Sequence, residues 1–472
     1  MHTFILSDLH IADAEPLDPK RPLWKAFKRR EHFVDDDVAG LLRFAADRAE
    51  SEGETCEVIF NGDVFDFDPI TQMPDPPPSP VHWLARLRGL GTEEWMSAFK
   101  MDIIVQDHPV FFAAVADFAR RGHQVVFVTG NHDVELVWPA VQARIRDALD
   151  LDEEGYTRIR FCDWFYLSAG DTYVSHGHQS DPYCVVTDPI HPLIQVRGRP
   201  CIRLPFGDVA NRYMLNGMGY FNPHATANYI MSGAAYVKFF FKYMVRDQPL
   251  LAWTWFWSAG VTLIITLAHF IRPPLRDPLM VEGKVQSIAE RSNATPAMVR
   301  QLAVSHVEPA ATNPLMIIRE LWLDRALLYI GIVYLSWQVI MAINLVWAIS
   351  TLWVLLPFAL LFPLFLQYSF RVKPETFALP LMDERRADWV HRITGARFAV
   401  MGHTHIPELK DIGPLRFCNG GFWSPAFTEP ECTTRIGTQT FVWLHGHNER
   451  ILELWEWPPG AAAPQPYDLA VS

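Results

Sequence analysis

QVVFVTGNHD, residues 124–133, runs from an apolar segment typical of a buried β-strand straight into a Gly-Asn-His-Asp loop. The same transition occurs twice upstream, in HTFILSD at residues 2–8 and in CEVIFNGD at residues 56–63. Helical patterns separate these strands. Residues 34–45 place apolar side chains on one face, and residues 109–122 begin with a proline and end with a glycine after two arginines. Strands that alternate with helices predict an α/β fold built in layers.

This alternation is interrupted by one long segment of different composition. The strand-and-loop pattern stops near Pro205 and resumes in the last quarter of the chain. We therefore predict a core in two parts, residues 1–204 and 377–457, separated by a helical insertion at residues 205–376. The tail at residues 458–472 is rich in alanine and proline and is predicted to be disordered.

Polar side chains suited to metal binding follow five of the predicted strands. Side chains at positions i and i+2 of an extended chain point the same way, so Asp8 with His10, and His403 with His405, should each converge on one point. In open α/β sheets the loops at the carboxyl ends of the strands meet in one crevice. The five stretches are Asp8-Leu9-His10, Gly62-Asp63, Gly130-Asn131-His132-Asp133, His176-Gly177-His178 and Gly402-His403-Thr404-His405.

The residue types in these loops indicate the kind of ion. Mixed oxygen and imidazole ligands favour Mn, Fe or Zn over Ca or Mg, with Mn as the first expectation. Seven such ligands are too many for one ion but suit two ions that share a carboxylate. Two ions about 4 Å apart activate a bridging water and neutralise both ends of an in-line displacement at phosphorus. The loops therefore predict a two-metal phosphoester hydrolase.

The ordered set DxH, GD, GNHD, HGH and GHTH resembles the calcineurin-like metallophosphoesterase family over residues 1–200 and 377–457. The stretch FCNGGFWSP, residues 417–425, is similar to the Asn-x-Gly-x-Trp sequence that follows GHTH in many members. The resemblance implies a four-layer α-β-β-α sandwich and a metal-bridging hydroxide that attacks phosphorus.

The resemblance also implies a role for each matching residue. Asp63 would bridge both ions. The first ion would be held by Asp8, His10 and His405, and the second by Asn131, His176 and His403.

Four further residues have implied roles around these ligands. His132 would protonate the leaving oxygen and must stay free of metal to do so. Asp66 matches the carboxylate that orients this histidine, and Asp133 is the other candidate for that role. His178 would steady a ligand without binding the ion itself.

Two arginines are candidates for binding an anionic substrate. Arg197 and Arg199 lie shortly after the HGH stretch, and ordinary solvated loop charges explain them equally well. The chain as a whole carries a formal net charge of −12, so it lacks the basic surface of a nucleic-acid-binding protein. Its six cysteines show no CxxC spacing and indicate buried thiols in a reducing compartment.

The insertion contains three apolar stretches at residues 250–271, 326–348 and 350–370. The last two form one run of 45 residues without a charged side chain. His176 and His403 flank the insertion and should bind the same ion, so the chain crosses a membrane an even number of times between them. Either 250–271 and 326–348 cross, or 326–370 forms a hairpin with 250–271 at the interface, or all three enter one leaflet.

The charges beside the first stretch indicate the side of the membrane. Lys238, Lys242 and Arg246 recur every four residues and would form a basic face for anionic headgroups. Asp8 interrupts the apolar run at the N-terminus, where a signal peptide would still be apolar. Both features favour a catalytic core on the cytoplasmic side.

These patterns together predict a membrane-associated two-metal phosphoester hydrolase that acts on a membrane lipid or a lipid-linked phosphate or pyrophosphate. The alternative is a metal-binding scaffold, or the regulatory domain of a membrane complex, with little turnover. If the apolar stretches do not enter a membrane, they predict a homo-oligomer interface instead.

Overall fold

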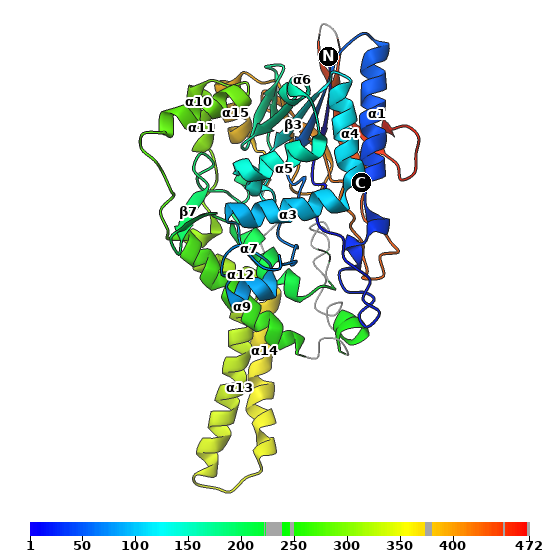
Figure 1. Cartoon of the computed structure of the whole chain (residues 1–472). Helices are drawn as coiled ribbons and strands as arrows, with labels where there is room; N and C mark the ends of the chain where they lie inside the picture. Colours follow the sequence, from blue (N-terminus) through cyan, green and yellow to red (C-terminus); the bar gives the residue numbers. More distant parts are fainter. Residues whose placement is uncertain (221, 223–237, 246–249, 373–379, 447–448, 470–472) are drawn as a thin grey trace.

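The computed structural model describes residues 1–220, 222, 238–245, 250–372, 380–446 and 449–469. These residues form a mixed α/β body with two main sheets and, projecting from one end, a pair of long antiparallel helices (Figure 1). The predicted α/β class is confirmed.

The larger sheet has seven strands in the order β14-β13-β12-β1-β2-β3-β4. Strands β1 to β4 are mutually parallel, and β12 pairs antiparallel with β1. The strands predicted before Asp8, Asp63 and Asn131 are β1, β2 and β3. The bounds are β1 His2–Leu6, β2 Cys56–Asn61, β3 Gln124–Val128, β4 Ile159–Cys162, β12 Gln439–His445, β13 Ile451–Trp457 and β14 Gln465–Pro466.

The second sheet has five strands in the order β10-β11-β9-β6-β5, and β6, β9 and β11 run parallel. The loops that carry His176 and His403 follow β6 and β9. The bounds are β5 Tyr166–Ser168, β6 Thr172–Val174, β9 Phe398–Met401, β10 Glu408–Ile412 and β11 Leu415–Asn419; a separate hairpin joins β7 Leu193–Val196 to β8 Arg199–Ile202.

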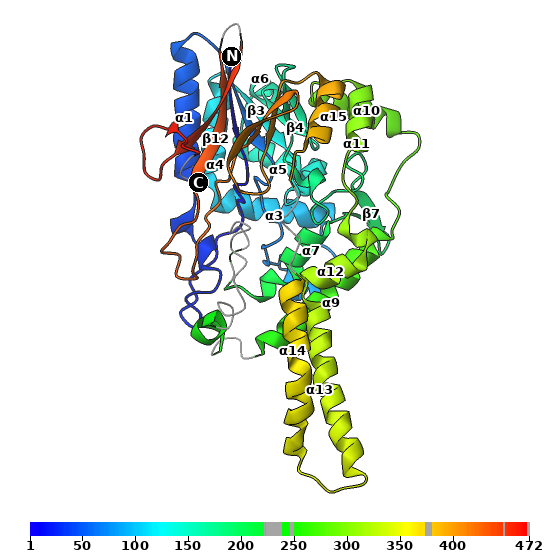
Figure 2. The ribbon, with the colours of Figure 1, turned by 180° about the vertical axis from the view of Figure 1, so that it is seen from behind.

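Alternate residues of the strands enter different hydrophobic clusters. Ile5 of β1 packs with Val174 and Phe398 of the second sheet, whereas its neighbours Phe4 and Leu6 pack with side chains of helix α1. The second sheet packs through Phe417 and other residues against helices α10, α11 and α15 (Figure 2). This alternation follows from the period of two along a strand.

The helices of the body agree with the apolar patterns of the sequence. The helix expected around residues 34–45 is α1, and Pro109 begins α4 as predicted. The bounds are α1 Asp35–Ser51, α2 Trp83–Arg88, α3 Glu94–Asp107, α4 Pro109–Arg120, α5 Pro139–Leu149, α6 Glu153–Thr157, α10 Val281–Arg291, α11 Pro296–Ala303 and α15 Glu384–Thr394.

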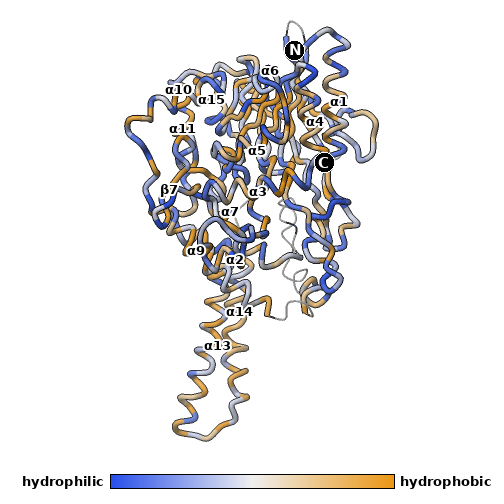
Figure 3. Tube along the Cα trace, viewed as in Figure 1, coloured by the Kyte–Doolittle hydropathy of each residue, from blue (hydrophilic) through white to orange (hydrophobic). Residues whose placement is uncertain are grey.

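The helices between Pro205 and Arg371 divide into a packed group and a projecting pair. Helix α9, within the first apolar stretch, packs through Ala259 against a cluster that includes Phe206 and Ile317. Helices α13 and α14 instead form a hairpin that projects from the body (Figures 1 and 3). The bounds are α7 Phe206–Tyr213, α9 Leu251–Phe270, α12 Pro314–Glu320, α13 Leu323–Asn344 and α14 Leu355–Arg371.

The hairpin has the composition of membrane-spanning helices. Residues 323–344 and 351–371 are each long and apolar enough to cross a bilayer, and only 17% and 0% of their most apolar windows are buried in the protein. Its buried positions Ile332, Ser336 and Ile340 recur every four residues and form an inner stripe. At its base, Tyr368 donates a hydrogen bond to Asp324 at 2.7 Å.

Two expectations about the chain are corrected or limited by the structure. The tail is not wholly disordered, because Gln465 and Pro466 form β14 and pair with Glu456 and Trp455 of β13. The backbone of β13 therefore has a partner on the side that would otherwise be a free sheet edge. Of the predicted basic face, Lys242 lies 3.4 Å from Glu431 and is partly neutralised, and Arg246 falls outside the described residues.

Candidate metal centre

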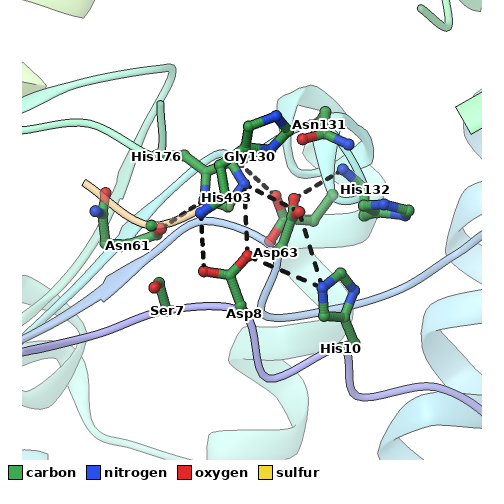
Figure 4. Close-up of polar contacts among 12 residues, drawn as sticks. Ser7, Asp8, His10, Asn61, Asp63, Gly130, Asn131, His132, His176 and His403 are labelled. Atoms are coloured by element: carbon green, nitrogen blue, oxygen red, sulfur yellow. Dashed lines mark hydrogen bonds and ion pairs between the residues drawn. The ribbon is translucent and has the colours of Figure 1, made fainter. Parts of the chain in front are cut away.

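The five predicted loops meet at the carboxyl ends of β1, β2, β3, β6 and β9 (Figure 4). The structure brings the six carboxylate and imidazole ligands together in two groups. Asp8, His10 and His405 offer ligand atoms that all lie within 4.8 Å of one another. Asp63, His176 and His403 do the same. Both groupings coincide with the ligand sets implied by the family resemblance.

The two carboxylates lie between the two sets of imidazoles. Asp63 Oδ2 is 3.0 Å from His176 Nε2 in one group and 4.0 Å from His10 Nε2 in the other. Asp8 Oδ1 is 3.1 Å from His405 Nε2 and 3.8 Å from His176 Nε2. A single oxygen of Asp63 therefore faces both groups, as a bridging ligand requires.

The loops reach this arrangement by a backbone geometry that the sequence reasoning missed. Asp8 and His10 have φ angles of 58° and 48°, and those of His403 and His405 are 71° and 61°. These residues are in the left-handed region and not in the extended chain expected from their i, i+2 spacing. Asp63 shares this conformation, with a φ of 51°. Left-handed backbone at residues other than glycine is unfavourable and is typical of functional sites held in place by their surroundings.

Two glycines allow this close packing. A Cβ atom on Gly130 would lie 2.2 Å from Asp63 Oδ1, and one on Gly402 would lie 2.4 Å from Asp8 Oδ2. Any side chain at either position would collide with a predicted ligand. The glycines of GNHD and GHTH are thus required by the space beside the carboxylates.

The charges of the centre stabilise one another. Burial raises the pKa of Asp8, but His176 and His405 outweigh it and bring that pKa to about 2. Burial likewise opposes ionisation of Asp63, whose pKa is nevertheless held well below its usual value by His176 and His132. Asp63 and Asp8 raise the pKa of His176 to about 9 against the effect of its burial. The carboxylates are therefore ionised at neutral pH, and a cation that binds His176 must displace its proton.

Hydrogen bonds orient three of the predicted ligands. His176 Nδ1 lies 2.9 Å from the carbonyl oxygen of Asn61, so its proton sits there and Nε2 is left to bind an ion. His403 Nε2 lies 3.0 Å from Asp181, which leaves Nδ1 as its ligand atom. The Asn131 amide donates to Asp208 at 3.1 Å.

That last contact fixes the direction of the Asn131 amide. With its nitrogen on Asp208, the amide turns Oδ1 the other way, and this buried oxygen has no hydrogen-bond partner among the described residues. Asp208 belongs to α7 and Asp181 to the loop after the HGH stretch, and neither was predicted from the sequence. The sequence feature that could have indicated Asp208 is its position within the amphipathic segment FGDVANRY, residues 206–213.

Asp66 and Asp133 separate into two different roles. His132 Nδ1 lies 3.3 Å from Asp66 Oδ1, with Asp208 Oδ1 at 3.6 Å. Asp133 instead accepts hydrogen bonds from the backbone amides of Gly130 at 2.6 Å and Val64 at 2.8 Å. Asp66 is therefore the carboxylate that faces His132, whereas Asp133 holds the GD and GNHD loops together.

His132 lies in an acidic environment at the edge of the centre. Burial lowers its pKa, but Asp66 and Asp63 raise that pKa well above its usual value. Asn211 of α7 places its amide nitrogen 3.3 Å from His132 Nε2. His132 also belongs to a third potential metal group with His10 and Asp63, so its freedom from metal stays a prediction.

The remaining predicted residues lie outside the ligand groups. His178 is buried, and its ring centre lies 5.6 Å from that of His176. A cavity of about 270 Å³ adjoins it, lined by apolar side chains such as Trp138 and Trp164 and by charged ones such as Asp163 and Arg291. Arg199 contacts Glu93 at 3.1 Å instead of the metal ligands, and Arg197 is exposed in the β7–β8 turn. Both arginines lie on the separate two-stranded hairpin and not in the loops of the metal centre, so their role in binding an anionic substrate stays a prediction.

Protein-family models and curated proteins were compared with this chain, and none of them matches it. The assignment of this centre therefore depends on its own residues and geometry.

We expect Asp208→Ala to weaken Mn²⁺ binding by about 10- to 100-fold, the range for residues that orient metal ligands. Without the acceptor on α7, the Asn131 amide is free to rotate. Asp208→Asn keeps an acceptor oxygen and should retain most of the affinity. Titration with Mn²⁺ measures both variants beside Asp411→Ala, which removes an exposed carboxylate on β10. Wild-type affinity in Asp208→Ala would rule out the orienting role.

Proposed function

We propose that this protein is a membrane-associated two-metal phosphoester hydrolase of the calcineurin-like metallophosphoesterase family, with a four-layer α-β-β-α sandwich as its core. The observation that carries the proposal is the position of Asp63, whose Oδ2 lies 3.0 Å from His176 and 4.0 Å from His10. One carboxylate oxygen between two separate ligand groups is the arrangement that a pair of ions requires.

The donor set fits two divalent transition-metal ions. Carboxylate and imidazole ligands favour Mn, with Fe or Zn as alternatives. The buried Oδ1 of Asn131, which has no partner among the described residues, gains one by binding an ion. Asp8, His10 and His405 would hold the first ion, Asn131, His176 and His403 the second, and Asp63 both.

The chain's own residues supply orientation and a proton. When bound, the two ions supply an activated water and neutralise charge on the phosphoryl oxygens. His132 stands beside the ligand groups with Asp66 at its Nδ1, and its Nε2, which lies 3.3 Å from the Asn211 amide nitrogen, would be the atom that protonates a leaving oxygen. Asp66 and Asp63 raise the pKa of His132 well above its usual value, which favours the protonated imidazole that a general acid needs.

The direction of the strands supports a lipid or lipid-linked phosphate or pyrophosphate as substrate. Strand β1 begins at the end of the body opposite the α13–α14 hairpin, and β2 and β3 run parallel to it (Figure 1). The loops after these strands, with Asp8, Asp63 and Asn131, therefore lie toward the end that bears the hairpin. If the hairpin enters a bilayer, the metal centre lies on the side of the bilayer that faces the body of the protein. We assign that side to the cytoplasm.

A turnover screen of the full-length chain in detergent micelles tests this proposal. Phosphomonoesters, phosphodiesters and lipid pyrophosphates should be offered with Mn²⁺, then with a chelator, then with Mn²⁺ restored. We expect hydrolysis of at least one class, lost with the chelator and recovered with the metal. Metal binding without hydrolysis of any of these substrate classes would contradict the proposed hydrolase and favour the metal-binding scaffold.

A further inference from the structure

Helix α2, on the catalytic body, has an unusual surface. Trp83 is 59% exposed and Leu87 is 53% exposed, and residues four apart lie on the same face of a helix. Arg86, between them, is also exposed. A short helix that presents tryptophan, leucine and arginine to its surroundings has the composition of a segment at a membrane interface.

Side-chain contacts fasten α2 to α9. The rings of Trp83 and Trp257 lie with their centres 6.2 Å apart, and the Arg88 guanidinium lies 5.6 Å from the centre of the Trp257 ring. Arg88 also donates a hydrogen bond to Ser258 at 3.5 Å. The exposed face of α2 is therefore held in a fixed place beside α9.

Helix α9 adds exposed apolar side chains of its own. Trp253 is 66% exposed, Ile264 is exposed further along the helix, and Ile271 is exposed directly after its end. Ser258, Thr262 and Thr266 are all buried, so the polar stripe of this helix is turned inward. An apolar face outside and a polar stripe inside is the reverse of the pattern for a helix in water.

This surface is continuous with the base of the hairpin. Leu263 and Phe270 of α9 pack in one cluster with Leu321 and Leu323, where α12 gives way to α13. Figure 3 shows α2 and α9 at the end of the body from which the hairpin projects. The residues Trp322, Asp324 and Arg325 at this junction precede the 45 uncharged residues and would lie at headgroup level.

We infer that α2 and α9 form a docking surface that rests in the headgroup region of the bilayer that receives the hairpin. The inference depends on the membrane association proposed above. A bilayer fits better than a second copy of the chain, because the surface borders an uncharged hairpin and combines exposed tryptophans with the exposed Arg86. The docked body turns the loops after β1, β2 and β3 toward the membrane that would carry a lipid-borne phosphate.

Photo-crosslinking of the full-length chain tests this surface. A benzophenone amino acid replaces one residue at a time in protein reconstituted into vesicles of phosphatidylcholine and phosphatidylglycerol. Leu87 tests the docking surface. Leu335, exposed on α13, reports on the hairpin, and Trp389, exposed on α15 at the far end of the body, is the matched control (Figure 2). Lipid adducts are identified by mass spectrometry of the labelled peptide.

We expect lipid adducts at Leu87 in a yield comparable with Leu335, and none at Trp389. Adducts at Leu335 with none at Leu87 would overturn the docking surface but keep the hairpin in the membrane. A crosslink from Leu87 to a second chain would overturn it in favour of an interface between copies. No adduct at Leu335 would remove the membrane association itself, and the docking surface with it.

Discussion

Asp63→Asn should abolish hydrolysis and remove both ions from the chain. The substitution keeps the size of the side chain but removes the negative charge that faces His176 and His10. A catalytic metal contributes several kcal/mol to the transition state, and each 1.36 kcal/mol is tenfold in rate, so the loss should be at least about 1000-fold.

Elemental analysis and turnover of the purified variant measure this effect together. Asp411→Asn, which neutralises an exposed carboxylate on β10, is the control and should match the wild type. A variant at Asp63 that retains two ions per chain would show that the carboxylate does not bridge them.

His132→Asn should keep the metals and slow hydrolysis by roughly 100-fold or more for substrates with poor leaving groups. Asparagine cannot supply a proton, whereas Asp66 beside His132 raises the pKa of its imidazole and favours the protonated form. A nitrophenyl ester needs less protonation of its leaving oxygen and should lose less activity.

The control for this variant is His445→Asn. His445 stacks on His2 at the start of β1, far from the ligands that follow that strand, and its loss should not affect turnover. Equal losses on the alkyl and the nitrophenyl ester would contradict the acid role of His132. Loss of metal would place His132 among the ligands, in the group that it forms with His10 and Asp63.

The identity of the clustered residues could be predicted from the sequence because each motif is local. A strand followed at once by DxH or GNHD places its polar residues at the carboxyl end, whatever the rest of the chain does. The conformation of those residues could not be predicted in the same way. Asp8 and His405 have left-handed backbone, which the surrounding structure must hold in place, so the i, i+2 spacing predicted the correct pairs from an extended conformation that the loops do not have.

The residues missed by the sequence reasoning depend on long-range packing. Asp208 reaches Asn131 only because α7 packs beside the GNHD loop, 77 residues away in the chain.

Long-range packing also decides how the apolar stretches are placed. Residues 250–271 and 326–348 look alike in composition, but α9 buries its stripe of Ser258, Thr262 and Thr266 against the body while α13 projects from it. The four-residue spacing of these polar residues could have indicated that one face of α9 packs against the protein.

Turnover measured against the number of bound Mn²⁺ ions tests the two-metal centre most directly. Chelated full-length protein is titrated with Mn²⁺, and bound metal and phosphoester hydrolysis are recorded on the same samples. The geometry around Asp63 predicts activity that rises with occupancy and saturates at two ions per chain. Saturation of binding at one ion, or two bound ions without hydrolysis, would contradict a two-metal phosphoesterase.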